Sequence, residues 1–287
     1  MPKSTQNVFG KIDQMYYELT ASEKKTADYV LAHRSETQYM SIAELAEESG
    51  VAEATVSRFC RRLGYRGYNI FKLAIANASA GQHGASGTLS GQIEESDSFE
   101  DMCAKLFSAD RDAMAQTLAQ LRPEPIRRAV DLLADAEKVI CMGQGGSMLM
   151  AEEAANLFSM VSGKFFAVPD SHSQIIAASN TGERDVLLFF SYSGATRDMM
   201  DTLHMAGERG TRVILVTRFA KSPGAALAEV VLPVGANESP LQLGSVSAKI
   251  AQLFLMDVLF SEYCRRDIDG CTARRERIAA ALANKHL

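Results

Sequence analysis

Hydrophobic positions follow one pattern in the front part of the chain and another in the back part. Up to about residue 77 the apolar residues recur at helical spacing, and no run is rich in Val or Ile. From about residue 137 onward, short apolar runs alternate with amphipathic stretches. This change predicts an all-α domain followed by an α/β domain.

Five apolar runs in the back part predict β-strands. They cover residues 138–143, 164–170, 185–191, 212–218 and 230–235. Helical stretches lie between them at 147–162, 171–181, 195–209 and, more briefly, near 222–228. Because the strands are almost continuously apolar and alternate with helices, we expect a five-stranded parallel sheet flanked by helices on both faces.

A linker is expected between the two domains. Residues 78–98 are rich in Gly, Ser and Ala and have no hydrophobic period. Bridging helices are expected at 99–121 and 126–136, separated by Pro123 and Pro125. The predicted division is a helical domain at 1–77, a linker with a bridging helix at 78–124, an α/β domain at 125–264 and a C-terminal helical tail at 265–287.

Two short helices separated by a tight turn are expected within residues 41–65. The first begins with Ser41 and Glu44, which have the spacing of a capping box, and it ends at Gly50. The second has apolar residues at i, i+3, i+4 and i+7 and stops at Gly64. Those apolar positions are Val56, Phe59, Cys60 and Leu63.

The outward face of this second helix is a candidate DNA-contacting surface. Small and hydroxyl residues near its start suit base edges in the major groove, and the arginines farther along suit phosphates. The candidate residues are Glu53, Ala54, Thr55, Ser57, Arg58, Arg61 and Arg62. The alternative is a basic helix face that is merely solvated.

Two predicted strands end in unusual loops. GQGGS (143–147) and SYSGAT (191–196) each lead into a helix, so glycines, hydroxyls and free N–H groups are available for a phosphate without a cationic residue. The candidate ligand-binding residues are Gly145, Gly146, Ser147, Ser191, Ser193, Gly194 and Thr196. For Ser193 or Thr196 alone, the alternative is an ordinary helix N-cap.

Three other chemistries fit these loops poorly. No lysine follows the glycines, which excludes a P-loop. Met148 stands where a dinucleotide fingerprint needs its third glycine, although Asp170 does end the next predicted strand. Ser191 stands where a nucleophile elbow needs a glycine. We therefore expect no cofactor, and the five scattered cysteines indicate neither a disulfide framework nor a metal site.

Charge and composition add two expectations. The net charge is −5, but residues 1–77 are at +1 and residues 78–287 at −6, so the front domain is better suited to a polyanion. No apolar run approaches ~18 residues, and the N-terminus lacks the pattern of a signal peptide. We expect a cytoplasmic protein that does not enter membranes.

Residues 8–76 closely resemble the N-terminal DNA-binding domain of RpiR-type (MurR/RpiR) transcriptional regulators. GxGxS in the first loop and SxSGxT in the second resemble the sugar isomerase (SIS) domain, and the SIS resemblance extends over about residues 125–262. In that family the SIS domain binds phosphorylated sugars. The resemblance implies phosphate contacts from Ser147, the backbone of Gly145 and Gly146, and the hydroxyls of Ser191, Ser193 and Thr196. Tyr192 stands where many relatives have a polar residue such as Gln.

The expected function is a DNA-binding regulator of carbohydrate metabolism genes, more specifically a repressor, whose operator binding depends on a sugar phosphate. The alternative is an SIS-type sugar-phosphate isomerase, which needs a base; Glu238, His172, Glu152 and Glu153 are the candidates. DNA half-sites call for a homodimer or homotetramer. The apolar helix at 245–264 is a candidate interface, and packing on its own sheet is the alternative.

Overall fold

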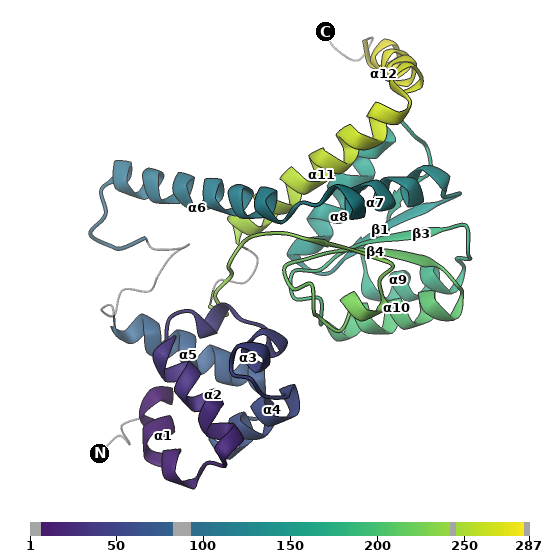
Figure 1. Cartoon of the computed structure of the whole chain (residues 1–287). Helices are drawn as coiled ribbons and strands as arrows, with labels where there is room; N and C mark the ends of the chain where they lie inside the picture. Colours follow the sequence, from purple (N-terminus) through teal and green to yellow (C-terminus); the bar gives the residue numbers. More distant parts are fainter. Residues whose placement is uncertain (1–6, 83–92, 242–244, 284–287) are drawn as a thin grey trace. The chain divides into compact units, whose positions relative to one another are not determined.

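The computed structural model of the protein describes residues 7–82, 93–241 and 245–283, which form two compact units (Figure 1). The first contains the described residues up to Ala109 together with Asn237–Ser245. The second contains Asp110–Ala236 and the described residues from Val246 onward. No helix in the described part of the chain is long and apolar enough to cross a membrane.

The first unit begins with five helices around one apolar core. They are α1 (Val8–Met15), α2 (Ala21–Ala32), α3 (Ile42–Glu48), α4 (Glu53–Arg62) and α5 (Tyr68–Gln82), with 3-10 turns at Tyr16–Glu18 and Thr37–Tyr39. Phe59 and Phe71 are fully buried and meet edge to face at 5.6 Å between ring centroids. The helix pair expected within residues 41–65 corresponds to α3 and α4, which are joined by a short turn at residues 49–52.

Local sequence signals explain where these helices begin and end. Ser41 and Glu44 form the expected capping box, in which the Ser41 hydroxyl accepts from Glu44 N–H and the Glu44 carboxylate accepts from Ser41 N–H. Gly50 and Gly64 have φ values of 63° and 86°, a backbone region that other residues rarely adopt. Both predicted helix ends therefore lie at their glycines.

The expected linker at 78–98 begins too early, because α5 continues as far as Gln82. Alanine is common at the end of this helix, and alanine favours helix as strongly as any residue. Residues 83–92 of the expected linker, the first six residues and the last four lie outside the described residues. The bridging helices are α6 (Phe99–Gln120) and α7 (Pro123–Asp135).

The second unit contains the predicted five-stranded parallel sheet. Its strands are β1 (Val139–Gly143), β2 (Phe165–Ala167), β3 (Val186–Phe190), β4 (Arg212–Thr217) and β5 (Val230–Pro233). They lie side by side in the order β2-β1-β3-β4-β5, and every pair is parallel. The fold class expected from the sequence is confirmed.

Helices cover both faces of this sheet. They are α7, α8 (Gly146–Ser159), α9 (Ser171–Ser179), α10 (Arg197–Glu208) and α11 (Val246–Arg266), with a 3-10 turn at Ala225–Leu227. The last helix, α12 (Ile268–Ala283), follows α11. Alternate strand residues enter two separate cores: Leu188 packs with α7, α8 and α11, whereas Leu187 and Phe189 pack with α9 and α10. The apolar face of α11 lies in the first of these cores, so its packing on its own sheet accounts for that face.

An aromatic cluster joins α8, β2 and α11. Phe158 is fully buried, and its ring centroid lies 4.5 Å from that of Phe165, 5.2 Å from Phe260 and 5.4 Å from Tyr263. Aromatic pairs at these distances add to the free energy gained from burial.

Phe158→Ala is expected to lower the free energy of unfolding of this unit by about 3–5 kcal/mol, because it leaves a cavity in that cluster. Urea unfolding followed by circular dichroism measures the change. Phe166→Ala is the matched control, since Phe166 is 52% exposed and its loss should cost no more than about 0.5 kcal/mol. Equal losses in the two variants would contradict the role given to the cluster.

Candidate functional site

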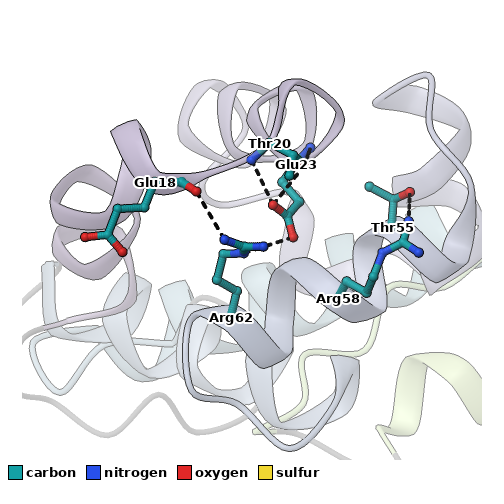
Figure 2. A network of polar contacts seen from close by, with 6 residues as sticks. All are labelled: Glu18, Thr20, Glu23, Thr55, Arg58 and Arg62. Atoms are coloured by element: carbon teal, nitrogen blue, oxygen red, sulfur yellow. Dashed lines mark hydrogen bonds and ion pairs between the residues drawn. The ribbon is translucent and has the colours of Figure 1, made fainter.

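The outward face of α4 carries most of the residues expected to contact DNA. Glu53, Ala54, Arg58 and Arg61 are exposed, and Ser57 is half-buried. Thr55, which was also expected on the outward face, is instead buried, with only 6% of its surface exposed. Its hydroxyl accepts a hydrogen bond from Arg58 Nη2 at 3.1 Å, so it orients the guanidinium of that arginine (Figure 2).

Arg62 differs from the other two arginines of this helix, because it is tied to the rest of the unit. Its Nε lies 3.2 Å from Glu23 Oε1, and its Nη1 donates to the carbonyl of Glu18 at 3.1 Å (Figure 2). The Arg61 guanidinium, in contrast, has no hydrogen-bond or ion-pair partner among the residues that the structure describes. Arg58 and Arg61 are therefore the arginines most available to a phosphate, while Arg62 fixes α4 against α2.

Glu23 is the buried partner in this contact, at 2% exposure. Burial by itself would raise the pKa of its carboxyl group, but hydrogen bonds from the backbone and hydroxyl of Thr20, together with the Arg62 charge, outweigh burial and lower that pKa. Glu23 also completes a capping box with Thr20 at the start of α2. One carboxylate thus caps one helix and holds another.

The second part of the site is created by the order of the strands. After β1 the chain builds β2 on one side, and it then returns to build β3 on the other side. The last residues of β1 and β3, Gly143 and Phe190, are direct register partners. The loops that follow them therefore begin side by side at the point where strand order reverses, which is where open parallel sheets bind ligands.

The first loop brings backbone close to backbone. A Cβ on Gly143 would lie 2.6 Å from the carbonyl oxygen of Ser147, so only glycine fits there. Gly145 precedes α8 with φ 54°. In the described part of the chain, the N–H groups of Gly145 and Gly146 have no acceptor, whereas Ser147 N–H already donates to Gln144 O at 3.1 Å. Both expected backbone donors, those of Gly145 and Gly146, are therefore available.

In the second loop most of the polar groups bond to one another. Ser191 is 4% exposed, and its Oγ accepts from Gly194 N–H at 3.2 Å, while Ser193 Oγ accepts from Ala195 N–H at 3.3 Å. Gly194 has φ 58°, and a Cβ there would lie 2.1 Å from Ser222 Oγ. The loop is therefore shaped by its own hydroxyls and by one obligatory glycine.

Thr196 lies at the N-cap of α10, one residue before the first turn in which it was expected. Its hydroxyl makes no capping hydrogen bond. Instead, Oγ1 donates across to the neighbouring loop, to Gln144 Oε1 at 3.3 Å. Neither hydroxyl therefore caps α10, because Ser193 lies three residues before the N-cap and bonds to Ala195 N–H within the loop.

Two glutamines that sequence reasoning missed connect the loops. Gln144 Nε2 donates to Gln174 Oε1 at 2.9 Å, and Gln174 is fully buried. Gln174 Nε2 in turn donates to the carbonyls of Gly143 and Val168, each at 2.9 Å. A chain of side-chain amides therefore runs from α9 through the first loop to Thr196.

The groups considered as catalytic bases are not connected to this chain of amides. His172 and Glu152 are exposed, and Glu153 is half-exposed. Glu238 is 8% exposed, belongs to the first unit and accepts from the Ser245 N–H at 2.8 Å. Tyr192 is also engaged, because its hydroxyl donates to the carbonyl of Ala236 at 2.8 Å.

Comparison with known proteins agrees with this architecture. Residues 6–82 match the model of the helix-turn-helix domain of the rpiR family, and residues 132–262 match that of the SIS domain. An HTH-type transcriptional regulator of Caldanaerobacter subterraneus is 32% identical over 98% of this chain and 99% of its own length. The chain belongs to the RpiR family of transcriptional regulators. A second relative, the HTH-type transcriptional regulator HexR of Escherichia coli, is 31% identical over 91% of this chain and 89% of its own length.

Solved structures show the same fold. The NanR protein of Vibrio vulnificus, solved in complex with ManNAc-6P, has a TM-score of 0.84 and 24% identity, and the match covers 98% of this chain and 99% of NanR. The sugar isomerase domain of an RpiR transcription factor from Sphaerobacter thermophilus has a TM-score of 0.57 and 23% identity over 62% of this chain and 98% of that domain. The match to NanR extends over both units, so NanR has the same two folds in the same order.

Glu23→Gln is expected to lower the free energy of unfolding by about 1–3 kcal/mol at pH 7, because the Arg62 and Thr20 contacts lose their charged acceptor. The folded-state pKa of Glu23 is lowered, so its stabilisation is present above the unfolded pKa of about 4.3 and is lost as pH falls through the folded value. Urea unfolding at a series of pH values should therefore show the two proteins converging below about pH 4. Glu18→Gln is the control, since Glu18 contributes only its backbone carbonyl.

Proposed function

We propose that this RpiR-family regulator is a repressor that binds operator DNA through α4 and senses a phosphorylated sugar at the loops after β1 and β3. One observation supports the sensor above all others: Gly143 and Phe190 are register partners, which brings two glycine- and hydroxyl-rich loops together at the switch point of the sheet. The NanR structure contains ManNAc-6P, which supports a phosphosugar as the class of effector.

The proposed ligand contacts come from both loops. The N–H groups of Gly145 and Gly146 lie at the start of α8, where the helix dipole favours an anion, and Ser147 follows in its first turn. From the other loop, Thr196 presents a hydroxyl at the start of α10, and Ser193 is accessible beside it, whereas buried Ser191 positions Gly194. Hydroxyls and amides of this kind bind a phosphate reversibly and leave its bonds intact.

The proposed DNA contacts are Glu53, Ala54 and Ser57 near bases and Arg58 and Arg61 at phosphates. Thr55 and Arg62 act indirectly, by orienting Arg58 and by holding α4 against α2. A recognition helix of ten residues reads few base pairs, so the proposed regulator is a homodimer or homotetramer that acts in the cytoplasm on paired half-sites.

The isomerase alternative receives less support. An aldose-ketose isomerase needs a base placed beside the carbon that loses its proton. Within the described residues, the hydrogen-bonded chain that joins the two loops consists of Gln174, Gln144 and Thr196. None of these side chains can act as such a base. The relatives in this family are named as transcriptional regulators, which also favours sensing.

Arg61→Ala is expected to weaken binding to the DNA beside the gene by about 10-fold and to reduce the slope of log affinity against log salt by about 1, because one phosphate contact is lost. Gel shifts at several salt concentrations measure both quantities. Arg122→Ala is the matched control, since Arg122 is tied to the carbonyls of Ala119 and Leu121 and does not belong to α4. Unchanged affinity and slope in Arg61→Ala would remove this residue from the interface.

Thr196→Val is expected to weaken the response to the sugar phosphate by about 10-fold or more, because a hydrogen bond to a charged group is worth about 1.5–3 kcal/mol. The measurement is a gel shift on the same DNA, titrated with a panel of sugar phosphates. Thr272→Val, an exposed position on α12, makes the same chemical change elsewhere. If no sugar phosphate altered DNA binding or thermal stability of the unmodified protein, the sensor half of the proposal would be wrong.

A further inference from the structure

A cavity lies in the second unit, away from the loops that follow β1 and β3. It has a volume of about 680 Å³, and its walls come from the end of α8, the end of α11 and one face of α12. Val161–Lys164, in its wall, lead into Phe165, the first residue of β2, whose partner Val139 begins β1. The cavity is therefore at the amino-terminal edge, whereas the phosphate loops follow the carboxyl ends of the strands. Its volume is within the range of small-molecule sites.

Four cationic side chains line this cavity, but only one carboxylate does. The cations are Lys164, Arg266, Arg274 and Arg277, and the carboxylate is Asp267. Arg274 and Arg277 are three residues apart on α12, where like charges repel and weaken a helix. Bringing these charges to one concave surface costs free energy that a bound anion would recover.

Two of the four cations already have a carboxylate partner. Arg274 Nη1 lies 3.2 Å from Asp267 Oδ2, and Arg266 is paired with Asp131 from α7. These two pairs leave Lys164 and Arg277 as the cations that a ligand would meet.

Lys164 is held by neutral groups. Its Nζ donates to the carbonyls of Ala134 at 2.6 Å and Ala136 at 3.0 Å, which leaves the third N–H of the ammonium group. Burial lowers its pKa, and Asp135 raises it by a smaller amount without forming an ion pair. Arg277 has no hydrogen-bond or ion-pair partner in the described part of the chain.

We infer that this cavity is a second anion site, which binds the phosphate group of a small phosphate monoester between Lys164 and Arg277. These two positive charges, neither of which forms an ion pair among the described residues, match a group that carries about −1.5 to −2 at pH 7. Arg277 supplies a planar fork of donors suited to phosphate oxygens, and Lys164 supplies a point charge. Ser162 and Tyr263 add hydroxyl groups to the same wall.

A bound phosphate would also connect α12 to the rest of the unit. Among the described residues of α12, only Cys271 is buried, although the helix has sixteen residues. Lys164 precedes β2, while Arg277 lies in the middle of α12, so an anion held by both joins the helix to the sheet.

The test is phosphate binding by the full-length protein, measured by isothermal titration calorimetry with inorganic phosphate and with glucose 6-phosphate. Arg277→Gln is expected to weaken binding at this site by about 10-fold or more, because a charge-assisted contact is lost. Arg277 is exposed and has no described partner, so circular dichroism should stay unchanged. Arg275→Gln is the matched control: it removes the same charge two positions away, where the guanidinium lies over the Phe260 ring.

A further variant separates this site from the loops after β1 and β3. Gly194→Ala distorts the second of those loops, so phosphate binding that persists in Gly194→Ala and is lost in Arg277→Gln supports a separate site. Equal weakening by Arg277→Gln and Arg275→Gln would show a general charge effect and overturn the inference. Weakened DNA binding in Arg277→Gln, with phosphate binding unchanged, would also overturn it and make this surface a DNA contact.

Discussion

The parallel pairing of β1 with β3 is the constraint on which the second unit depends. Because β2 lies on the far side of β1, the chain leaves β1 and β3 toward different helices: α8 enters the core shared with α11, and α10 enters the core shared with α9. The two loops therefore begin side by side but turn to opposite faces, and no crossover helix covers the space between them. Both loops need a glycine at one position, because a Cβ on Gly143 would collide with the Ser147 backbone and a Cβ on Gly194 with the Ser222 side chain.

The sequence carried enough information to predict the strands, because a strand buried on both faces has to be almost continuously apolar. The predicted ends were less accurate: the run at 164–170 yields only Phe165–Ala167, since this edge strand pairs with β1 over three residues. The loops were visible as hydroxyls and glycines after apolar runs. Gln174 was not, because a single buried glutamine in a helix has no periodic signal, and its role depends on strands that are distant in sequence.

The same limit applies to α4. Periodicity places Arg58, Arg61 and Arg62 on the outward side of the helix, but it does not show what each long side chain reaches. Arg62 extends to Glu23, a residue 39 positions earlier in the chain that also caps α2. Thr55 was expected on the exposed face of α4, but it is buried and its hydroxyl is hydrogen-bonded to the Arg58 side chain. Arginines of one short helix thus divide into two that are exposed, Arg58 and Arg61, and one, Arg62, that holds the helix against α2.

The hydrogen bond from Thr196 to Gln144 bears on how strongly the proposed sensor can respond. A phosphate at Thr196 competes for the hydrogen that Oγ1 now gives to Gln144, so the net gain is the difference between two hydrogen bonds. An effector shifts an equilibrium only by its difference in affinity for the two states, and typical couplings are about 1–3 kcal/mol. Gln144 also bonds to fully buried Gln174, so a change at Thr196 reaches β1 and α9 through side-chain amides. A phosphate site made of the hydroxyls and amides of these two loops, without a lysine, therefore suits reversible binding of an effector better than high-affinity binding.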